Sequence, residues 1–366
     1  MTLTDILTQA EKLGVSDVHI TAGSPPVYRL HGILFPIDSA EIKKRLDILN
    51  PEEIRTLTSE DTDGLAREIM SSKQYEKFAD KGEFDFSYSI PGVTRVRVNV
   101  FKQRHSTALV MRLLSTKIKS FEELGLPSVL SDLARRPNGL VLVTGPTGSG
   151  KSTTLAAMID LINREKRVHI LTLEDPIEYL HKHKLGLVNQ REIGQDTLSF
   201  AAALRAALRE DPDVILVGEM RDLDTISIAV TAAETGHLVM ATLHTSSAAE
   251  TIDRVVDVFP PEQQEQIRVQ LANTIEGIVS QQLIPRIDKP GRVAALEILV
   301  STPAIRNLIR EGKTFQIPTQ LQTGVKYGMQ TLDMSLRKLY QKKTISREEV
   351  VNRAHDPETL LKSLGG

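Results

Sequence analysis

Residues 145–152 form a phosphate-binding loop of the GxxxxGK[ST] type. Its residues are Gly145, Pro146, Thr147, Gly148, Ser149, Gly150, Lys151 and Ser152, with Thr153 next in the chain. The glycines let backbone N–H groups wrap around phosphates, and a following helix points its positive end at the same anion. Lys151 would reach the β- and γ-phosphates, and Ser152 would hold Mg²⁺. We therefore expect the chain to bind ATP and Mg²⁺ here.

Two clusters of acidic residues could serve ATP hydrolysis, which needs a group that orients or deprotonates water. Glu219 ends the apolar segment 214–217, but Gly218 stands before it where many phosphate-loop enzymes have aspartate. We therefore expect Glu219 to act through metal-bound water or on the nucleophile. The alternative general base is Glu178, and its neighbours Glu174 and Asp175 are candidate metal groups. The competing interpretation is that these acids are solvated loop residues.

Two histidines, His237 and His244, bracket the apolar segment 238–243. Neither has the spacing or the cysteine neighbours of a metal site. Their positions at the two ends of one strand favour a sensor of the γ-phosphate, with His237 binding the nucleotide and His244 acting in catalysis. The alternative is that each histidine is an ordinary hydrogen-bonded structural residue.

The elements around these motifs alternate between strands and helices from about residue 120 onward, which predicts a mostly parallel sheet covered by helices. The expected strands are 140–144, 169–173, 214–217 and 238–243, and each ends in a polar cluster. Ligands of open α/β sheets bind at the carboxyl ends of the strands. The four clusters are therefore predicted to meet at one nucleotide site.

The first 114 residues predict a separate, smaller α+β domain. A helix over 3–14 precedes short strands at 16–20, 27–30 and 33–35, and a later helix covers 72–81. An earlier helix is expected to open with Asn50 as its cap and Pro51 in its first turn. A hairpin joins 84–90 to 95–101 through Pro91 and Gly92, and a last strand covers 108–114. On the second arm of the hairpin, Arg95, Arg97 and Asn99 share one face.

The length of 366 residues suits two domains with separate cores. We predict a first domain over 1–114, a linker over 115–119, a core over 120–300 and a helical C-terminal region over 301–366. The net charge of −2 gives no overall basic field for nucleic acid, and the absence of cysteine excludes disulfides and zinc knuckles. No membrane span or signal peptide is visible, so we expect a cytoplasmic protein with only peripheral membrane association.

The motifs occur in the order found in the secretion ATPase superfamily, the motors of type II and type IV secretion and of type IV pili. The matching segments are the loop at 145–152, the acidic box at 174–178, the Walker B segment at 218–222 and the histidine box at 237–245. Segments 16–19 and 25–29 resemble the PAS-like N-terminal domain of that family. The resemblance covers almost the whole chain, except the charged segment 39–66.

This resemblance implies a homohexameric ring whose RecA-like cores bind ATP at the seams between neighbouring subunits. Arginines of the N-terminal domain, best matched by Arg95, Arg97 and Arg112, would then neutralise phosphate charge in the transition state. The family also implies an inner-membrane platform protein of the PilC-like kind as partner, with the pilin filament contacted indirectly. The alternative is that Arg95 and Arg97 form only the solvent face of an amphipathic strand.

The direction of the motor is predicted from two features. Residues 304–311 resemble the C-terminal signature of the pilus retraction members, and the assembly members carry a four-cysteine zinc element that this chain lacks. We therefore expect retraction, with pilus assembly or type II secretion as the alternative. In the same segment Ile305, Leu308 and Ile309 would dock on the core while Arg306, Arg310 and Glu311 face water. A DNA-translocating hexamer is the alternative of another class, although the core has no run of basic residues.

Overall fold

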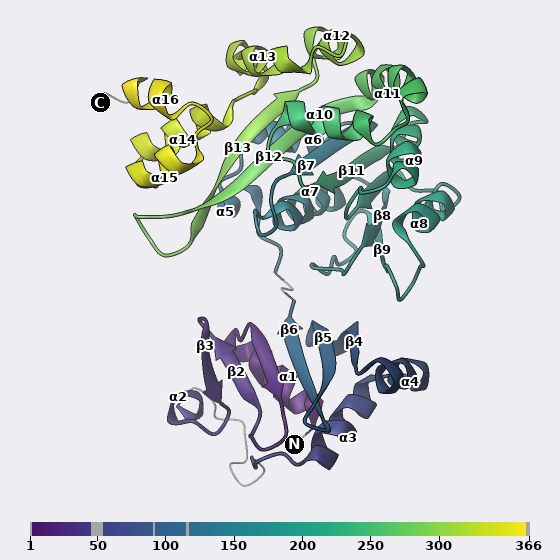
Figure 1. The fold of residues 1–366 in the computed structure, drawn as a ribbon, viewed down its shortest axis with the longest axis vertical. Coiled ribbons are helices and arrows are strands. Elements are labelled where there is room, and N and C mark those ends of the chain that lie inside the picture. The colour runs from purple at the N-terminus through teal and green to yellow at the C-terminus, as the bar shows by residue number, and fades with distance from the viewer. Residues whose placement is uncertain (1, 45–53, 91, 115–116, 364–366) are drawn as a thin grey trace. The chain divides into compact units, whose positions relative to one another are not determined.

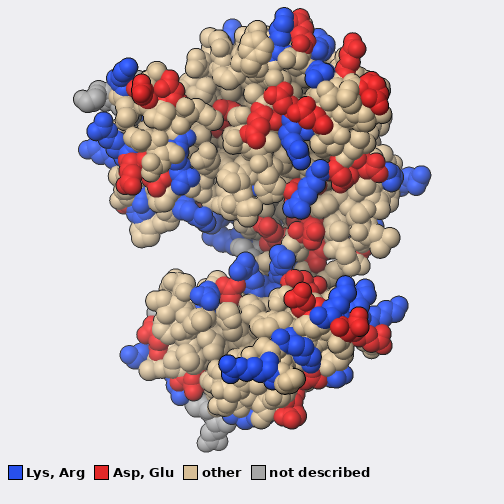
Figure 2. All heavy atoms as spheres, viewed as in Figure 1, with Lys and Arg blue, Asp and Glu red and all other residues tan. Residues whose placement is uncertain are grey.

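The computed structural model describes residues 2–44, 54–90, 92–114 and 117–363. The chain divides into two compact units. The first comprises Met1–Lys117 together with Glu178–Leu180, and the second comprises Ile118–Ile177 and His181–Gly366. Each unit has its own hydrophobic core. Figure 2 shows basic and acidic side chains interspersed over the visible face of the units. Within the described ranges, no helix combines the length and the apolarity needed to cross a membrane.

The first unit is an antiparallel six-stranded sheet in the order β3-β2-β1-β6-β5-β4, packed with helices (Figure 1). Its strands are β1 (Asp17–Ile20), β2 (Val27–Leu30), β3 (Ile33–Pro36), β4 (Glu83–Ile90), β5 (Thr94–Gln103) and β6 (Ser106–Leu113). Its helices are α1 (Leu3–Leu13), α2 (Ala40–Lys43), α3 (Ser59–Ile69) and α4 (Ser72–Lys81). The small α+β domain and its long hairpin are confirmed. Asn50, Pro51 and Pro91 lie outside the described residues.

Local sequence explains where these elements begin and end. Thr2 and Asp5 form a capping box at the start of α1, and Gly14 ends the helix in the left-handed conformation at φ 70°. In β5 the valines at 96, 98 and 100 are fully buried, while the residues between them are more exposed. Period-two alternation therefore fixes which face of this strand meets the core.

The second unit is built on a seven-stranded sheet in the order β13-β12-β7-β11-β10-β8-β9. Its strands are β7 (Gly139–Thr144), β8 (His169–Glu174), β9 (Leu187–Glu192), β10 (Val214–Val217), β11 (Leu238–Leu243), β12 (Ile275–Pro285) and β13 (Arg292–Val300). All neighbouring strands pair in parallel except β12 and β13, which form an antiparallel hairpin. The four predicted strands and the α/β fold class are confirmed.

The helices of this unit precede, separate or follow its strands. They are α5 (Phe121–Leu124), α6 (Ser128–Ala134), α7 (Lys151–Glu165), α8 (Phe200–Ala207), α9 (Leu223–Glu234), α10 (Ala248–Asp257), α11 (Pro261–Thr274), α12 (Pro303–Arg310), α13 (Ile317–Thr323), α14 (Leu332–Gln341), α15 (Arg347–Arg353) and α16 (Pro357–Ser363). Figure 1 shows α14, α15 and α16 beside the long β12–β13 hairpin, where Leu336, Ile345 and Val350 form a small core with Ile284.

The helix α12 corrects one sequence expectation. Ile305, Leu308 and Ile309 are buried as predicted. The prediction that Arg306 faces water is wrong, since its side chain is only 26% exposed and pairs with Glu276 at 2.9 Å. Its Nη1 also donates to the last carbonyls of α11, those of Ala272 and Asn273. Carbonyls at a helix end lack intrahelical donors, and this arginine supplies them.

Candidate active site

The phosphate loop connects β7 to α7 with three glycines at positive φ, namely Gly145 at 137°, Gly148 at 78° and Gly150 at 90°. Crowding is greatest at Gly145, where a Cβ would lie 2.2 Å from the carbonyl oxygen of Gln281. The same Cβ would lie 2.7 Å from Oγ of Ser149. A side chain at Gly145 would therefore both strain the backbone and displace the loop from β12.

Gln281 of β12 holds the loop from the side. Its Nε2 donates to the carbonyl of Ser149 at 2.7 Å, and its Oε1 accepts from Oγ1 of Thr154 at 2.8 Å. The side chain is buried, with 3% of its surface exposed. This glutamine thus links the loop and the first turns of α7 to the neighbouring strand. The sequence analysis missed it, although a Ser-Gln-Gln run inside the apolar segment 275–285 was an available signal.

The interior of the loop fits a polyphosphate. Lys151 is 9% exposed, and its Nζ donates to the carbonyls of Gly145 at 2.8 Å and Pro146 at 3.2 Å. The buried Oγ of Ser149 has no hydrogen-bond partner among the described residues. A buried cation, an unpaired hydroxyl and the amino end of α7 together form a donor set for anionic oxygens. Ser152 and Thr153 are half-buried in the first turn of α7, and Thr147 is exposed on the loop.

Glu219 and His244 are brought together beside this loop. Nε2 of His244, at the end of β11, lies 3.1 Å from Oε1 of Glu219, which follows β10. Leu243 pairs with Thr144 of β7, so His244 stands next to the start of the loop. Thr242 fixes the position before Glu219, because its Oγ1 donates to the carbonyl of Gly218 at 2.5 Å. The order of the strands, with β11 between β7 and β10, therefore assembles this part of the predicted site.

The electrostatics keep Glu219 ionised. Burial acts to raise the pKa of this carboxyl, but a hydrogen bond from Nε of Arg221 and the charge of His244 outweigh it, so the pKa is lowered. The pKa of Arg221 is raised by the same hydrogen bond and by the charge of Glu219, with a contribution from Asp175. Glu219 is thus a carboxylate acceptor at neutral pH, as a group that orients water must be.

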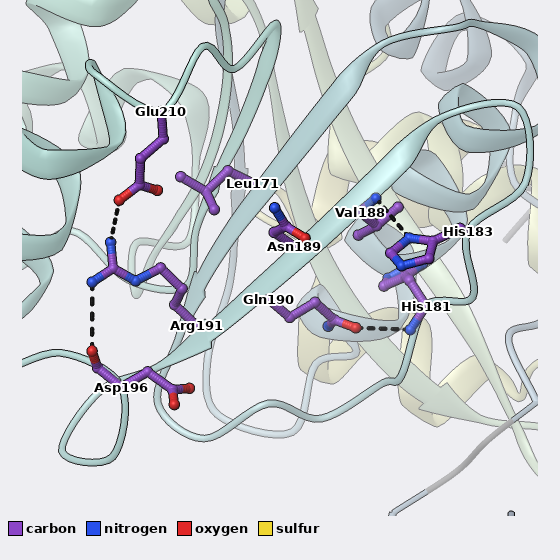
Figure 3. A pocket seen from close by; sticks show the side chains of 9 residues that line it. All are labelled: Leu171, His181, His183, Val188, Asn189, Gln190, Arg191, Asp196 and Glu210. Carbon is purple, nitrogen blue, oxygen red and sulfur yellow. Dashed lines mark hydrogen bonds and ion pairs between the residues drawn. The ribbon is translucent and has the colours of Figure 1, made fainter.

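The acidic box at the end of β8 is only partly engaged. Glu174 accepts hydrogen bonds from Oγ1 of Thr172 at 2.7 Å and from Nε2 of Gln190 at 3.1 Å. Oε1 of the same Gln190 accepts a hydrogen bond from the backbone N–H of His181 at 2.8 Å. Both residues line an open pocket of about 580 Å³ along β9 (Figure 3). This bridge fixes the far end of the segment that carries Glu178, which is itself exposed, as is Asp175.

The predicted metal groups do not form a preassembled site. Among the described residues, no three His, Cys, Asp or Glu side chains are grouped as a metal ion would need. Glu174, Asp175 and Glu219 therefore do not make a cage. Such an arrangement is compatible with Mg²⁺, which is often bound by few protein ligands together with phosphate oxygens and water.

The structure does not bring His237 to the phosphate loop. It precedes Leu238, which pairs with Gly139 at the amino ends of β11 and β7. Its Nδ1–H donates to the carbonyl of Ala232 at 2.9 Å. The strand that separates His237 from His244 places them at opposite ends of β11, about 23 Å apart at the strand rise of roughly 3.3 Å per residue. Within this unit, His237 fits the alternative of a structural histidine.

The three candidate arginines lie on one face of the first unit's sheet. Arg97 of β5 pairs in register with Arg112 of β6, and Arg95 is two residues away on the same strand. Nε of Arg112 donates to Oδ1 of the buried Asp17 at 2.9 Å, while its side chain stays 69% exposed. Arg97 is half-exposed, and Nη1 of Arg95 donates to Oγ of Ser89 at 3.0 Å.

Comparison with known proteins gives matches over nearly the whole chain. Residues 2–301 match the family model described as type II/IV secretion system protein. The chain is 51% identical, over 98% of its length and 100% of the relative, to a Pseudomonas aeruginosa protein named type IV pilus retractation ATPase PilT. A twitching motility protein of Neisseria gonorrhoeae is 47% identical, over 95% of this chain and 91% of that protein. A crystal structure of the pilus retraction motor PilT with bound ADP superposes with a TM-score of 0.88, at 48% identity and 99% coverage of both chains.

Proposed function

Because the chain belongs to the type II/IV secretion system protein family, we propose that it is an ATP-hydrolysing motor that drives the retraction of type IV pili. The observation that carries this proposal is the match, at about half identity and nearly full length, to relatives named for pilus retraction and twitching. The phosphate loop supports the proposal, since its glycines leave room for backbone N–H donors, Lys151 supplies a cation, and Gln281 holds the loop against β12.

In the proposed reaction, the loop N–H groups and Lys151 bind the β- and γ-phosphates and compensate their charge. Ser152 would hold Mg²⁺, which neutralises charge on the phosphate oxygens. Glu219, oriented by Arg221 and His244, positions the attacking water and accepts its proton. Glu178 is the alternative base, and Glu174 and Asp175 act around the metal from the same edge of the sheet.

Each site is completed by a neighbouring subunit in this proposal. Arg95, Arg97 and Arg112 of one protomer approach the phosphates bound by the next protomer in a homohexameric ring. The exposed guanidinium of Arg112, held at Nε by Asp17, leaves its terminal nitrogens available for a phosphate. The pull of bound triphosphate on these arginines closes each seam and converts hydrolysis into movement of the units.

The proposed location is the cytoplasmic face of the inner membrane, with peripheral association only. The partner is a PilC-like platform protein, through which the motor acts on the pilin filament indirectly. No nucleic acid is expected as a substrate.

Deleting the gene in its host and counting surface pili tests the direction of the motor. Retraction predicts surplus, immobile filaments on cells that no longer twitch. Bald cells would instead indicate pilus assembly, and normal pili with a secretion defect would indicate a type II secretion role. Nanomolar, salt-dependent binding of DNA by the purified protein would favour a translocase.

A further inference from the structure

A basic surface lies at the far end of the β12–β13 hairpin. We call it the basic corner and define it by Lys289, Arg292, Lys342, Lys343 and Arg347, with the apolar Ile287 at its tip. All six side chains are exposed, Ile287 to 61%. Figure 2 shows blue side chains, with red ones among them, along the left edge of this unit, where Figure 1 places α15 and the hairpin.

Hydrogen bonds hold the two halves of the corner together. The hairpin tip closes through the N–H of Arg286, which donates to the carbonyl of Gly291 at 3.1 Å. The N–H of Ile287 donates to the carbonyl of Thr344, in the turn after α14, at 2.9 Å. Every residue of the corner lies within five chain positions of either Ile287 or Thr344, the two residues that this second hydrogen bond joins. The charges therefore gather at one place instead of being spread along two loops.

The concentration of charge here differs from the rest of the protein. Residues 286–292 and 337–349 contain eight lysines and arginines, one aspartate and two glutamates, a net charge of +5, while the whole chain carries −2. The remaining residues therefore carry −7. Of the two glutamates, Glu348 is exposed next to Arg347, and Glu349 pairs with Arg353. The aspartate, Asp288, pairs with Arg286, which is not part of the corner. Lys343 adopts φ 56°, a conformation that glycine would take at less cost, yet a cation occupies it.

The corner is separate from the nucleotide site. Ile287 follows Gln281 by six residues along β12 and its turn, a distance of about 20 Å at the strand rise of roughly 3.3 Å per residue. The small core of Ile284, Leu336, Ile345 and Val350 supports it from beneath. Surface substitutions at the corner should therefore leave the loop and its carboxylates in place.

We propose that the basic corner docks the protein on an anionic phospholipid surface. This deepens the proposed peripheral association with the inner membrane, on which it rests, by naming the surface and the lipid chemistry that make the contact. Juxtaposed lysines and arginines are attracted to anionic headgroups, and an exposed isoleucine at a hairpin tip can enter the headgroup boundary. Lysine, which supplies three of the five charges, is depleted from protein–protein interfaces. A nucleic acid backbone would offer nothing for Ile287 to contact.

The test is co-sedimentation of the full chain with vesicles of phosphatidylcholine, with and without phosphatidylglycerol. We expect binding only to the anionic vesicles, weakening as salt rises. A triple variant, Lys289→Glu, Lys342→Glu and Lys343→Glu, should bind at least tenfold more weakly, since each cation near such a surface is worth roughly a factor of five. Ile287→Ser should weaken binding several-fold without changing its dependence on salt.

The matched control changes charge equally at another surface. Lys73→Glu, Lys77→Glu and Lys81→Glu alter three exposed lysines of α4 in the first unit and should retain binding. Equal loss in both triple variants would show an effect of net charge alone and overturn the proposal. Wild-type binding to duplex DNA but not to vesicles would overturn it in favour of nucleic acid. Phosphate release without vesicles should match wild type in the corner variant, which separates this test from that of the motor.

Discussion

Replacing Gln281 by methionine should release the phosphate loop while conserving side-chain volume. Methionine cannot donate to the carbonyl of Ser149, and its sulfur is a poor acceptor for the hydroxyl of Thr154. The carbonyl of Ser149 and the hydroxyl of Thr154 would then be left in a buried position without these hydrogen-bond partners. Such a group costs about 1–3 kcal/mol, so we expect the free energy of unfolding of the second unit to fall by about 3 kcal/mol.

Two measurements check this expectation. In a unit of this size, about 3 kcal/mol lowers the melting temperature by roughly 6–12 °C. The loop must also be reordered when ADP binds, which we expect to weaken ADP binding about tenfold or more in titration calorimetry. Gln282→Met is the matched control, because Oε1 of this neighbouring side chain accepts a long hydrogen bond, at 3.5 Å, from Nη1 of Arg353.

The outcome for ADP decides the interpretation. If Gln281→Met melts early but binds ADP with wild-type affinity, the glutamine stabilises the sheet and does not preorganise the loop. If neither quantity differs from the Gln282→Met control, the reasoning from these two hydrogen bonds is refuted.

Three further predictions concern ionisable groups. Glu219→Gln should reduce phosphate release by roughly 10²-fold or more while ADP binding persists, and Glu178→Gln should do the same, whereas Lys151→Ala should lose both. Burial lowers the pKa of His181 to about 4, so the folded protein holds this histidine neutral. Its contribution to the free energy of unfolding should be complete above pH 6.5 and should fall by ~2 kcal/mol near pH 5. Urea unfolding of wild type and of His181→Gln at both pH values measures this loss. Burial raises the pKa of Glu297, against a hydrogen bond from the N–H of Ala248 at 2.8 Å. The protonated carboxyl therefore stabilises the fold fully below pH 4.5, and this stabilisation is lost as the pH rises through the raised pKa of Glu297. Glu297→Gln should accordingly become more stable relative to wild type as the pH increases.

Each of these has a contrary result. Unchanged turnover in Glu219→Gln would remove that carboxylate from the reaction, and unchanged turnover in both glutamine variants would indicate a nucleotide-gated scaffold. A wild-type urea midpoint that tracks His181→Gln from neutral to acid pH would mean that the histidine titrates normally. A Glu297→Gln variant that loses stability as pH rises would show that the carboxylate itself is favoured at that position.

The parts of the site that depend on local sequence were predictable. The phosphate loop is a continuous motif, and Glu219 and His244 follow strands whose apolar residues are evident in the sequence. Parallel pairing then brings their carboxyl ends to one edge. The register of β7 with β11 confirms the placement of His244 beside the loop.

The parts that depend on long-range pairing were not predictable from motifs. β12 begins directly after α11, between Thr274 and Ile275, with no glycine or proline to mark the change. The strand and the role of Gln281 were therefore missed. The sequence does not distinguish the two ends of a buried strand, whereas the structure places only His244, at the carboxyl end of β11, beside the loop. Arg306 has the helical spacing of a solvent residue, but the end of α11 lies beside it.

The central claim is that arginines of one protomer act on nucleotide bound at Lys151 of the next. It is tested by mixing a Lys151→Ala protomer with one carrying Arg95→Gln, Arg97→Gln and Arg112→Gln, and measuring phosphate release. Each variant alone should assemble and be inactive, and the mixture should recover activity at seams that combine an intact loop with intact arginines. Mixed rings that form but release no phosphate would contradict the claim, as would full activity in the arginine variant by itself.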